Sequence, residues 1–173
     1  MPSLADAAPM KTAVRPARPA DVDLVHRFIL ELADYERLTH EAIVSLDEVN
    51  AALFGEPARA YCDIAEADGE PVGFALWVYN FSTFVGRAGI WLEDLYVRPA
   101  ARGRGAGKAL LAHLARRCRD ENLGRLEWAV LNWNTPSIGF YDALGAEALT
   151  GWTTRRLAGD ALARLAGEGG AGP

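Results

Sequence analysis

The 173-residue chain has little cysteine and little histidine. Its two cysteines, Cys62 and Cys118, lie far apart, which is typical of neither a disulfide framework nor a C-x-x-C metal site. The three histidines show no paired spacing of the kind that places two metal ligands on one helix face. The sequence therefore predicts that the protein uses no metal.

Long apolar runs and an excess of positive charge are also missing. No stretch approaches the roughly 18 apolar residues that a membrane-spanning helix needs, and the first ten residues lack the cationic start and apolar core of a signal peptide. The formal net charge of −5 argues against a nucleic-acid partner, because nucleic-acid-binding domains usually carry a basic face. We expect a cytoplasmic protein with no membrane partner, whose acidic balance serves either solubility or the attraction of a cationic substrate.

Chain length predicts one domain. We expect it to span residues 11–166, preceded by a disordered leader at 1–10 and followed by a disordered tail at 167–173, because both ends are rich in small residues.

The periodicity of apolar residues predicts alternating strands and helices of the α/β class, with a mixed sheet. Strands are expected at 12–15, 61–67, 71–81, 89–97 and 125–131, and helices at 21–38, 45–54, 105–122 and 136–145. A turn at 68–70 predicts a hairpin. The segment 146–157 is expected to add strands that close the sheet.

Three of the predicted helices have informative side chains. Ser45 and Glu48 are spaced as a capping box. Thr135 is expected to be an N-cap, with Pro136 as the first helical residue. In the helix over 105–122, an apolar stripe is expected to face the core, whereas other positions are expected to face solvent, namely His113, Arg116 and Arg117.

A glycine-rich connection, Arg102 to Gly107, joins a predicted strand to a predicted helix. Glycines allow positive φ and a close approach of the backbone to a ligand, and free amides at a helix start attract phosphate. The dinucleotide fingerprint fails because its third glycine would fall at Lys108. The P-loop fails because Arg102 replaces its first glycine and Ala109 replaces its metal-binding hydroxyl. The pattern that fits is R-x-x-G-x-G.

That pattern is the signature of the GNAT acetyltransferase superfamily, which the chain resembles over residues 12–157. Within the superfamily it looks like the spermidine/spermine (diamine) acetyltransferase branch. The segments that carry the resemblance are Arg15-Pro16-Ala17, 31–36, 92–97, 102–107, 133–141 and Gly151-Trp152. The resemblance implies a mixed, mostly antiparallel sheet of about six or seven strands flanked by about four helices.

The resemblance also implies direct transfer of an acetyl group from acetyl-CoA to a primary amine of a small molecule. The amine would belong to a diamine, a polyamine or a lysine-like amino acid, and the protein would be a homodimer. The implied cofactor-binding residues are Leu95, Tyr96, Val97, Arg102, Gly103, Arg104, Gly105, Ala106, Gly107, Lys108, Asn134, Ser137 and Tyr141.

Such a transfer needs a base that takes the ammonium proton and an acid that protonates the departing thiolate. By resemblance, Tyr141 is the acid; its alternative is a tyrosine packed in the core with its hydroxyl bonded. Glu93 is our candidate base, acting through water, and its alternative is a carboxylate satisfied by amides or an arginine. Burial among apolar neighbours would raise a carboxyl pKa toward a useful range.

Strand alternation predicts how Glu93 and its neighbour Asp94 are oriented. Successive side chains point to opposite faces, so Glu93 would share a face with Trp91, Leu95 and Val97. Asp94 would share the other face with Leu92 and Tyr96. The two adjacent carboxylates would then not form a same-face pair, and Asp94 is assigned a structural role.

The resemblance places substrate contacts at Tyr35, Glu36, Glu93, Glu127 and Trp128, and anionic and aromatic groups suit an ammonium ion. Two departures add positive charge near these positions, Arg37 and the pair Arg155-Arg156. They favour a smaller amine, such as an amino acid whose carboxylate needs a cation. The alternatives are acetylation of a protein or peptide, and a non-enzymatic CoA-binding module.

Overall fold

The computed structural model describes residues 11–168, so the predicted leader at 1–10 and the segment 169–173 lie outside the described residues. The described chain divides into two compact units, 11–129 and 130–168. The first unit contains the sheet and three α-helices, α1 (Val22–Glu36), α2 (Leu46–Phe54) and α3 (Ala106–Asp120). The second contains α4 (Thr135–Asp142) and α5 (Gly159–Glu168), and α5 enters the segment that was expected to be a tail.

The sheet has five strands in sequential order. They are β1 (Thr12–Pro16), β2 (Tyr61–Ala67), β3 (Glu70–Ser82), β4 (Arg87–Val97) and β5 (Leu126–Trp128). The first four pair antiparallel, and β5 joins β4 in parallel. The mixed, mostly antiparallel sheet confirms the expected architecture, with fewer strands than the expected six or seven.

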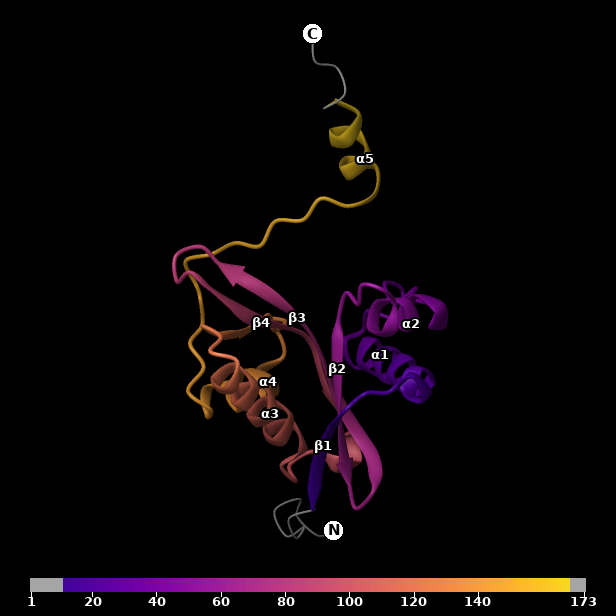
Figure 1. Ribbon diagram of the computed structural model, residues 1–173, viewed down its shortest axis with the longest axis vertical. Coiled ribbons are helices and arrows are strands. Elements are labelled where there is room, and N and C mark those ends of the chain that lie inside the picture. Colours follow the sequence, from indigo (N-terminus) through magenta and orange to yellow (C-terminus); the bar gives the residue numbers. More distant parts are fainter. Residues whose placement is uncertain (1–10, 169–173) are drawn as a thin grey trace. The chain divides into compact units, whose positions relative to one another are not determined.

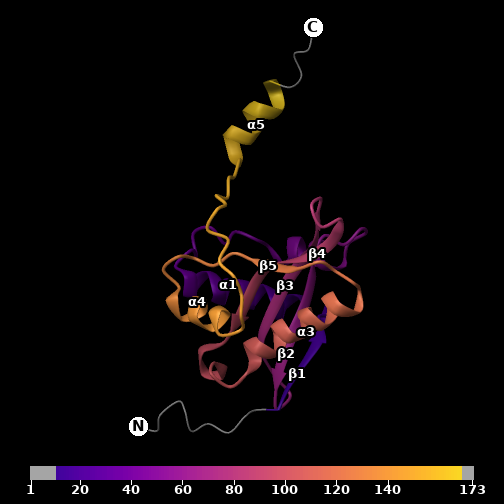
Figure 2. The same cartoon turned by 90° about the vertical axis from the view of Figure 1, so that its left-hand side faces the viewer.

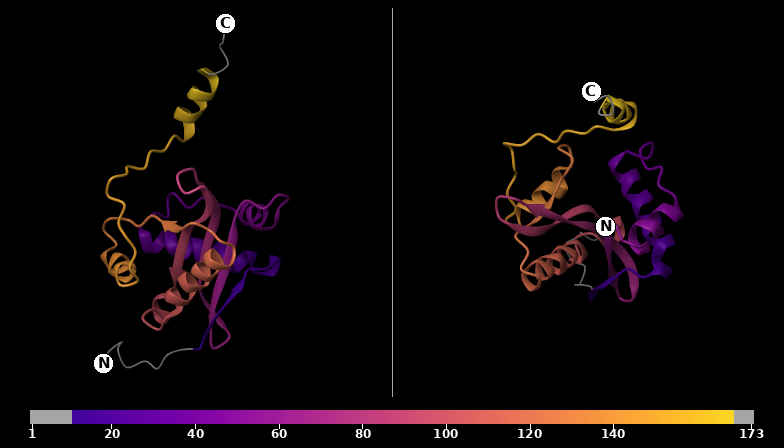
Figure 3. Two further views of the ribbon diagram at one scale, coloured as in Figure 1. Left: turned by 60° about the vertical axis from the view of Figure 1, so that its left-hand side comes forward. Right: turned by 45° about the horizontal axis from the view of Figure 1, so that its top comes forward.

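Helices cover both faces of this sheet (Figures 1 and 2). Helices α1 and α2 lie on one face, and α3 lies on the other (Figure 3). On the α1 face, the ring of Phe28 stacks on that of Phe74 with 5.5 Å between centroids. The ring of Tyr96 also lies against Phe28, with 6.2 Å between centroids. Side chains of β2 and α2 complete this core, among them Ile64 and Leu53. The apolar stripe of α1 is therefore what fixes the helix against the middle of the sheet.

Local side-chain signals define the start of two helices. The Ser45–Glu48 capping box is confirmed, because Ser45 N donates to Glu48 Oε2 at 2.7 Å and Glu48 N donates to Ser45 Oγ at 3.3 Å. The predicted cap of α4 is wrong by one residue. Asn134 is its N-cap and accepts a hydrogen bond from Ser137 N at 3.3 Å, while Thr135 is already helical. Proline fits either of the first two helical positions since neither amide has an intrahelical acceptor.

The expected strands at 146–157 are not formed, since this segment contains neither helix nor strand. A strand exists only through hydrogen bonds to a partner, and nothing in residues 11–168 pairs with this segment. Helix α5, which follows it, was not predicted. Its leucines Leu162 and Leu165 are exposed.

Two side chains of α3 that were expected to face solvent point to the sheet instead. His113 Nε2 lies 3.3 Å from Asp63 Oδ1, and Asp63 on β2 is only 2% exposed. The Asp63 carboxylate also accepts a hydrogen bond from Trp77 Nε1 at 2.8 Å. The Arg117 guanidinium lies 5.1 Å from the centroid of the Trp77 ring. A buried carboxylate needs such partners, and long polar side chains at the margin of an apolar stripe can reach it.

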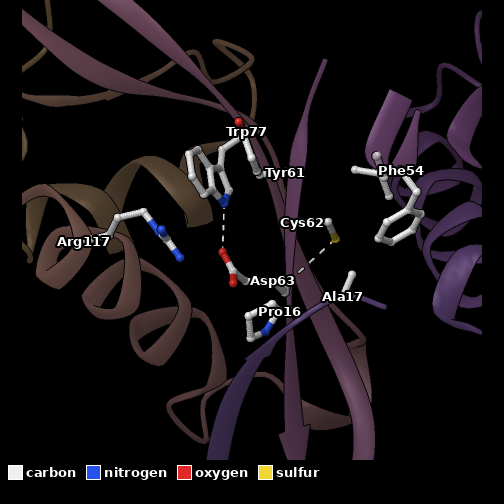
Figure 4. A pocket seen from close by; sticks show the side chains of 9 residues that line it. Pro16, Ala17, Phe54, Tyr61, Cys62, Asp63, Trp77 and Arg117 are labelled. Carbon is white, nitrogen blue, oxygen red and sulfur yellow. Dashed lines mark hydrogen bonds between the residues drawn. The ribbon is translucent and has the colours of Figure 1, made fainter. Parts of the chain in front are cut away.

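A cavity of about 110 Å³ lies beside this cluster (Figure 4). It is lined by Pro16, Ala17, Leu53, Phe54, Tyr61, Cys62, Asp63, Trp77 and Arg117. None of these residues was predicted to bind substrate or cofactor. Burial raises the pKa of the Cys62 thiol, so Cys62 is not a reactive thiolate at neutral pH.

We expect Asp63→Ala to lower the free energy of unfolding by about 1–3 kcal/mol, because the Trp77 indole loses its acceptor in a buried position. Asp120→Ala is the matched control, because Asp120 is exposed and its ion pair within residues 11–168 is with its neighbour Arg119. Urea denaturation followed by tryptophan fluorescence measures both variants. Equal stability of the two variants would contradict a structural role for Asp63.

Candidate active site

Strand β4 contains a β-bulge at Glu93. Leu76 of β3 pairs with Asp94, whereas the next residue, Trp77, pairs with Leu92. Glu93 is therefore the extra residue, without a partner on β3. A bulge adds one residue to one strand and shifts the alternation of every side chain that follows.

The bulge corrects the predicted orientation of the carboxylates. Tyr96 is in the α1 core, and Asp94, two residues earlier, is on the same α1 face. Leu92 pairs with Trp77 on the α3 face, so Asp94 does not share a face with Leu92. The Trp91 indole Nε1 donates to Glu93 Oε2 at 2.8 Å, which keeps Glu93 on the side of Trp91.

Leu95 and Val97 also depart from the prediction that they share a face with Glu93. They alternate with Tyr96 after the bulge and thus face α3, whereas Trp91 pairs with Val78, which packs against the α1 core. Glu93 and Asp94 are adjacent carboxylates on the α1 face. The strand forms the same-face pair that regular alternation excludes.

Burial, together with the nearby charges of Glu93 and Glu36, raises the pKa of the Asp94 carboxyl to about 7. Glu36 is the last residue of α1, and its own pKa is raised by burial. The effect of Glu36 on the pKa of Asp94 places the end of α1 near this part of β4. Like charges that share a partly buried region favour one protonated member.

The bulge also coincides with the point where β4 and β5 separate. Their pairing runs from Ile90 with Leu126 to Leu92 with Trp128 and ends there. Strand β4 continues to Val97, paired with β3 on its other side. Over Leu95–Val97, the edge that faces away from β3 has no strand partner within residues 11–168. Backbone groups at such an edge can bind an extended ligand, and Leu95, Tyr96 and Val97 are among the predicted cofactor-binding residues.

The glycine loop leads from this edge into α3. Gly103 has φ 72° and Gly105, the N-cap of α3, has φ 94°. The first backbone hydrogen bond of α3 is donated by Ala109 to the Gly105 carbonyl at 2.9 Å. The amides of the first turn of α3, from Ala106 to Lys108, have no acceptor within the helix. They form a set of donors at the positive end of the helix dipole.

Cationic side chains accompany these amides. Arg104 Nε is buried without a hydrogen-bond partner in the described chain, and Lys108 is exposed at the start of α3. An orphaned guanidinium nitrogen beside free amides fits a multiply charged anion such as a diphosphate. Arg102 differs, because its Nε donates to the Val97 carbonyl at 2.8 Å and its guanidinium carbon lies 4.2 Å from the Tyr35 ring centroid.

The two predicted substrate residues on β5 are separated by the sheet. Glu127 pairs with Trp91 on the α1 face, whereas Trp128 pairs with Leu92 on the α3 face. Glu127 is also partly neutralised, because Arg125 Nε lies 2.6 Å from its carboxylate and Asn80 Nδ2 donates to it at 3.1 Å. The structure thus brings Tyr35, Glu36 and Glu93 toward one face of β4 and does not add Trp128 to them.

The remaining predicted site residues, Asn134, Ser137 and Tyr141, belong to the second unit. Asn134 and Ser137 form the N-cap of α4. The rings of Phe140 and Tyr141 contact each other at 5.3 Å between centroids. The roles of these residues in acetyl transfer stay predictions.

Asp94 is the residue that sequence reasoning missed. The bulge that turns it toward α1 depends on the register between β3 and β4, and no residue type in Leu92–Asp94 signals it. The nearest sequence signal was the doubled carboxylate itself, Glu93-Asp94, within an otherwise apolar strand.

Residues 11–168 contain no cluster of three or more histidine, cysteine or acidic side chains arranged to hold a metal ion. None of the helices in this range has both the length and the apolar character that crossing a bilayer requires.

Comparison with known proteins agrees with this geometry. The model of the acetyltransferase (GNAT) family matches residues 26–146, which include the acidic face of β4, the glycine loop and α4. The chain therefore belongs to the GNAT acetyltransferase family and is an N-acetyltransferase.

Relatives and solved structures of similar length support the assignment. A thialysine N-epsilon-acetyltransferase of Bos taurus is 39% identical over 90% of this chain and 97% of its own length. An L-ornithine N5-acetyltransferase of Arabidopsis thaliana is 28% identical over 88% of this chain and 87% of its own length. The structure of an integron cassette protein from the mobile metagenome of V. cholerae superposes with a TM-score of 0.75 at 28% identity, covering 91% of this chain and 98% of that one.

The raised pKa of Asp94 predicts a specific pH dependence of stability. Between the ordinary carboxyl pKa of 3.8 and about 7, the folded protein keeps a proton that the unfolded chain releases. The stabilisation that this bound proton gives the folded state is fully present below pH 3.8. It is lost as pH rises toward 7, at about 1.4 kcal/mol per pH unit at most. Asp94→Asn should therefore gain stability relative to the wild type between pH 4 and pH 7. Urea titrations at several pH values measure the difference, and a constant difference would refute the shift.

Proposed function

We propose that the protein transfers the acetyl group of acetyl-CoA to a side-chain amine of a small basic amino acid or a diamine. The observation that carries this proposal is the group of carboxylates at Glu36, Glu93 and Asp94, beside an unpaired edge of β4 that leads into the glycine loop. In this proposal, a cationic amine binds next to the acidic groups. A thioester bound along the β4 edge would lie beside the same part of the strand.

The amine side favours a compact substrate with more than one charge. An ammonium group is attracted by the Glu93–Asp94 pair and by Glu36. Arg37, the next residue along the chain, offers a cation for a substrate carboxylate. Relatives named for thialysine and for ornithine act on amino acids with a side-chain amine, which agrees with this pattern.

The thioester side is assigned to the backbone of Leu95–Val97 and to the loop. The amides of 103–108, with Arg104 and Lys108, would hold the diphosphate by charge-assisted hydrogen bonds. Asn134 and Ser137 are proposed as further cofactor contacts. Acetyl-CoA supplies an acetyl group already activated as a thioester, so the protein needs no metal or covalent intermediate for this step.

The proton transfers are assigned to side chains of this chain. The Glu93–Asp94 pair takes the ammonium proton, Glu93 as the member exposed to the arriving amine and Asp94 as the member whose pKa of about 7 suits a base at neutral pH. The Tyr141 hydroxyl donates a proton to the departing thiolate. This assignment keeps Glu93 as base and adds Asp94 to it.

A homodimer is part of this proposal. Large apolar side chains of the second unit are exposed, namely Leu149, Trp152, Leu157, Leu162 and Leu165. Exposed large apolar side chains can contribute to a surface that binds another protein, and a second copy is the simplest partner for an expected dimer. Truncation after Ala148 should yield a monomer in sedimentation experiments, while the intact chain sediments as a dimer; a monomeric intact chain would refute the proposal.

The substrate assignment predicts that CoA thiol release requires an added amine. When acetyl-CoA is the donor, ornithine, lysine and thialysine should support faster release than spermidine or a short peptide. Only these free amino acids carry both a side-chain amine and an α-carboxylate on the same small molecule. A thiol-trapping dye measures each rate. Release only with the peptide would indicate a protein acetyltransferase, and tight CoA binding without release for any amine would indicate a binding module.

Tyr141→Phe should lower kcat by about 10²–10⁴-fold, the usual contribution of general acid catalysis, with little change in the dissociation constant of acetyl-CoA. Phe140→Leu is a control that changes the adjacent aromatic ring without removing a hydroxyl. Steady-state rates and calorimetric titration separate the two quantities. A kcat for Tyr141→Phe within a factor of two of the wild type would remove Tyr141 from the acid role.

A further inference from the structure

Arg102 opens the glycine loop, but its side chain contacts strand β4 and helix α1. Its Nε donates to the Val97 carbonyl at 2.8 Å. The guanidinium carbon lies 4.2 Å from the ring centroid of Tyr35 and 5.7 Å from that of Tyr96. One side chain thus joins the last residue of β4 to the end of α1.

The partners of Arg102 are neutral, which distinguishes it from the arginine four positions earlier. Arg98 binds the Glu31 carboxylate through Nε at 3.0 Å and through Nη2 at 2.8 Å, and this pair lowers the pKa of Glu31. Arg98 is therefore an ion-paired link between β4 and α1. Arg102 has no ion pair within residues 11–168 and interacts through a carbonyl and two aromatic faces.

The geometry makes a substitution by lysine non-equivalent. Nε of a planar guanidinium can donate along its edge while its face stacks on a ring, whereas an ammonium cannot do both. A cation–π contact contributes about 0.5–2 kcal/mol, depending on how far water is excluded. Tyr35 directly precedes Glu36, whose partly buried carboxyl interacts with Asp94. A change at Arg102 therefore reaches the acidic residues through Tyr35.

We propose that Arg102 is a positioning residue that couples the amine side of the site to the thioester side through Tyr35, and that it is not a ligand of the diphosphate. The inference rests on the proposed function for its kinetic consequence. The side chain of Arg102, the arginine of the R-x-x-G-x-G pattern, is thereby assigned to the junction of α1 and β4. The diphosphate is left to the amides of 103–108, Arg104 and Lys108.

The test compares two acetyl donors, acetyl-CoA and S-acetylpantetheine, because the second lacks the diphosphate. Arg102→Gln keeps a donor for the Val97 carbonyl but removes the charge and the fork. It should lower kcat/KM for the amine by about 3- to 30-fold with either donor, as expected from the loss of a cation–π contact. Lys108→Met is the matched control for a phosphate contact, and its effect should appear only with acetyl-CoA.

Tyr35 tests the coupling directly. Tyr35→Leu and Arg102→Gln should have nearly the same effect on kcat/KM for the amine, and the double variant should lose little more than either one. Tyr35→Phe keeps the aromatic face and should retain more activity than Tyr35→Leu. If the fold-losses in kcat/KM of Tyr35→Leu and Arg102→Gln multiplied in the double variant, the coupling would be refuted.

Binding of CoA without turnover gives an independent readout. By calorimetry, Arg102→Gln should keep the dissociation constant of CoA within about twofold, whereas Lys108→Met should weaken binding several-fold. A loss of CoA affinity in Arg102→Gln that equals or exceeds that of Lys108→Met would overturn the inference. So would a kinetic effect that vanishes with S-acetylpantetheine. If the wild type binds CoA and acetylates no amine, the proposed function fails, while the affinities of the two variants still decide whether Arg102 binds phosphate. Thermal melting of Arg102→Gln confirms that the variant is folded.

Discussion

The register of one strand pair determines the geometry on which the proposed acetyl transfer depends. At Glu93, β4 gains a residue relative to β3, and immediately before it the pairing with β5 ends. The first event turns Asp94 toward α1, and the second frees one edge of the strand. A regular strand with a continuous neighbour would have offered neither adjacent carboxylates on one face nor free backbone groups next to them.

Much of this arrangement could be predicted from local sequence. The capping box of Ser45 and Glu48, the hairpin turn at 68–70 and the glycine loop depend on interactions between residues a few positions apart. The bulge at Glu93 could not be predicted, because register is a property of two strands. The same holds for His113, whose position outside the apolar stripe suggested solvent until β2 supplied the buried carboxylate of Asp63.

The two sides of the proposed site carry opposite charge, although the net charge of the chain is −5. Glu36 and Asp94 are partly buried on the α1 face, which makes that side attractive to a cation. Arg104 and Lys108 accompany the free amides at the start of α3, which makes the other side attractive to an anion. Overall composition hides this separation, because the acidic excess of the rest of the chain outweighs the loop.

The backbone of the glycine loop has a consequence for the variation that this segment can tolerate. A Cβ at Gly103 or Gly105 would meet no atom of the protein within 4 Å, so packing against the rest of the chain is not what requires glycine. The requirement is the positive φ of both residues. Asparagine enters that region of backbone space more readily than other residues with a side chain, whereas valine and isoleucine are disfavoured there. In the absence of cofactor, the stability of variants at these two positions should therefore rank by backbone preference and not by side-chain volume.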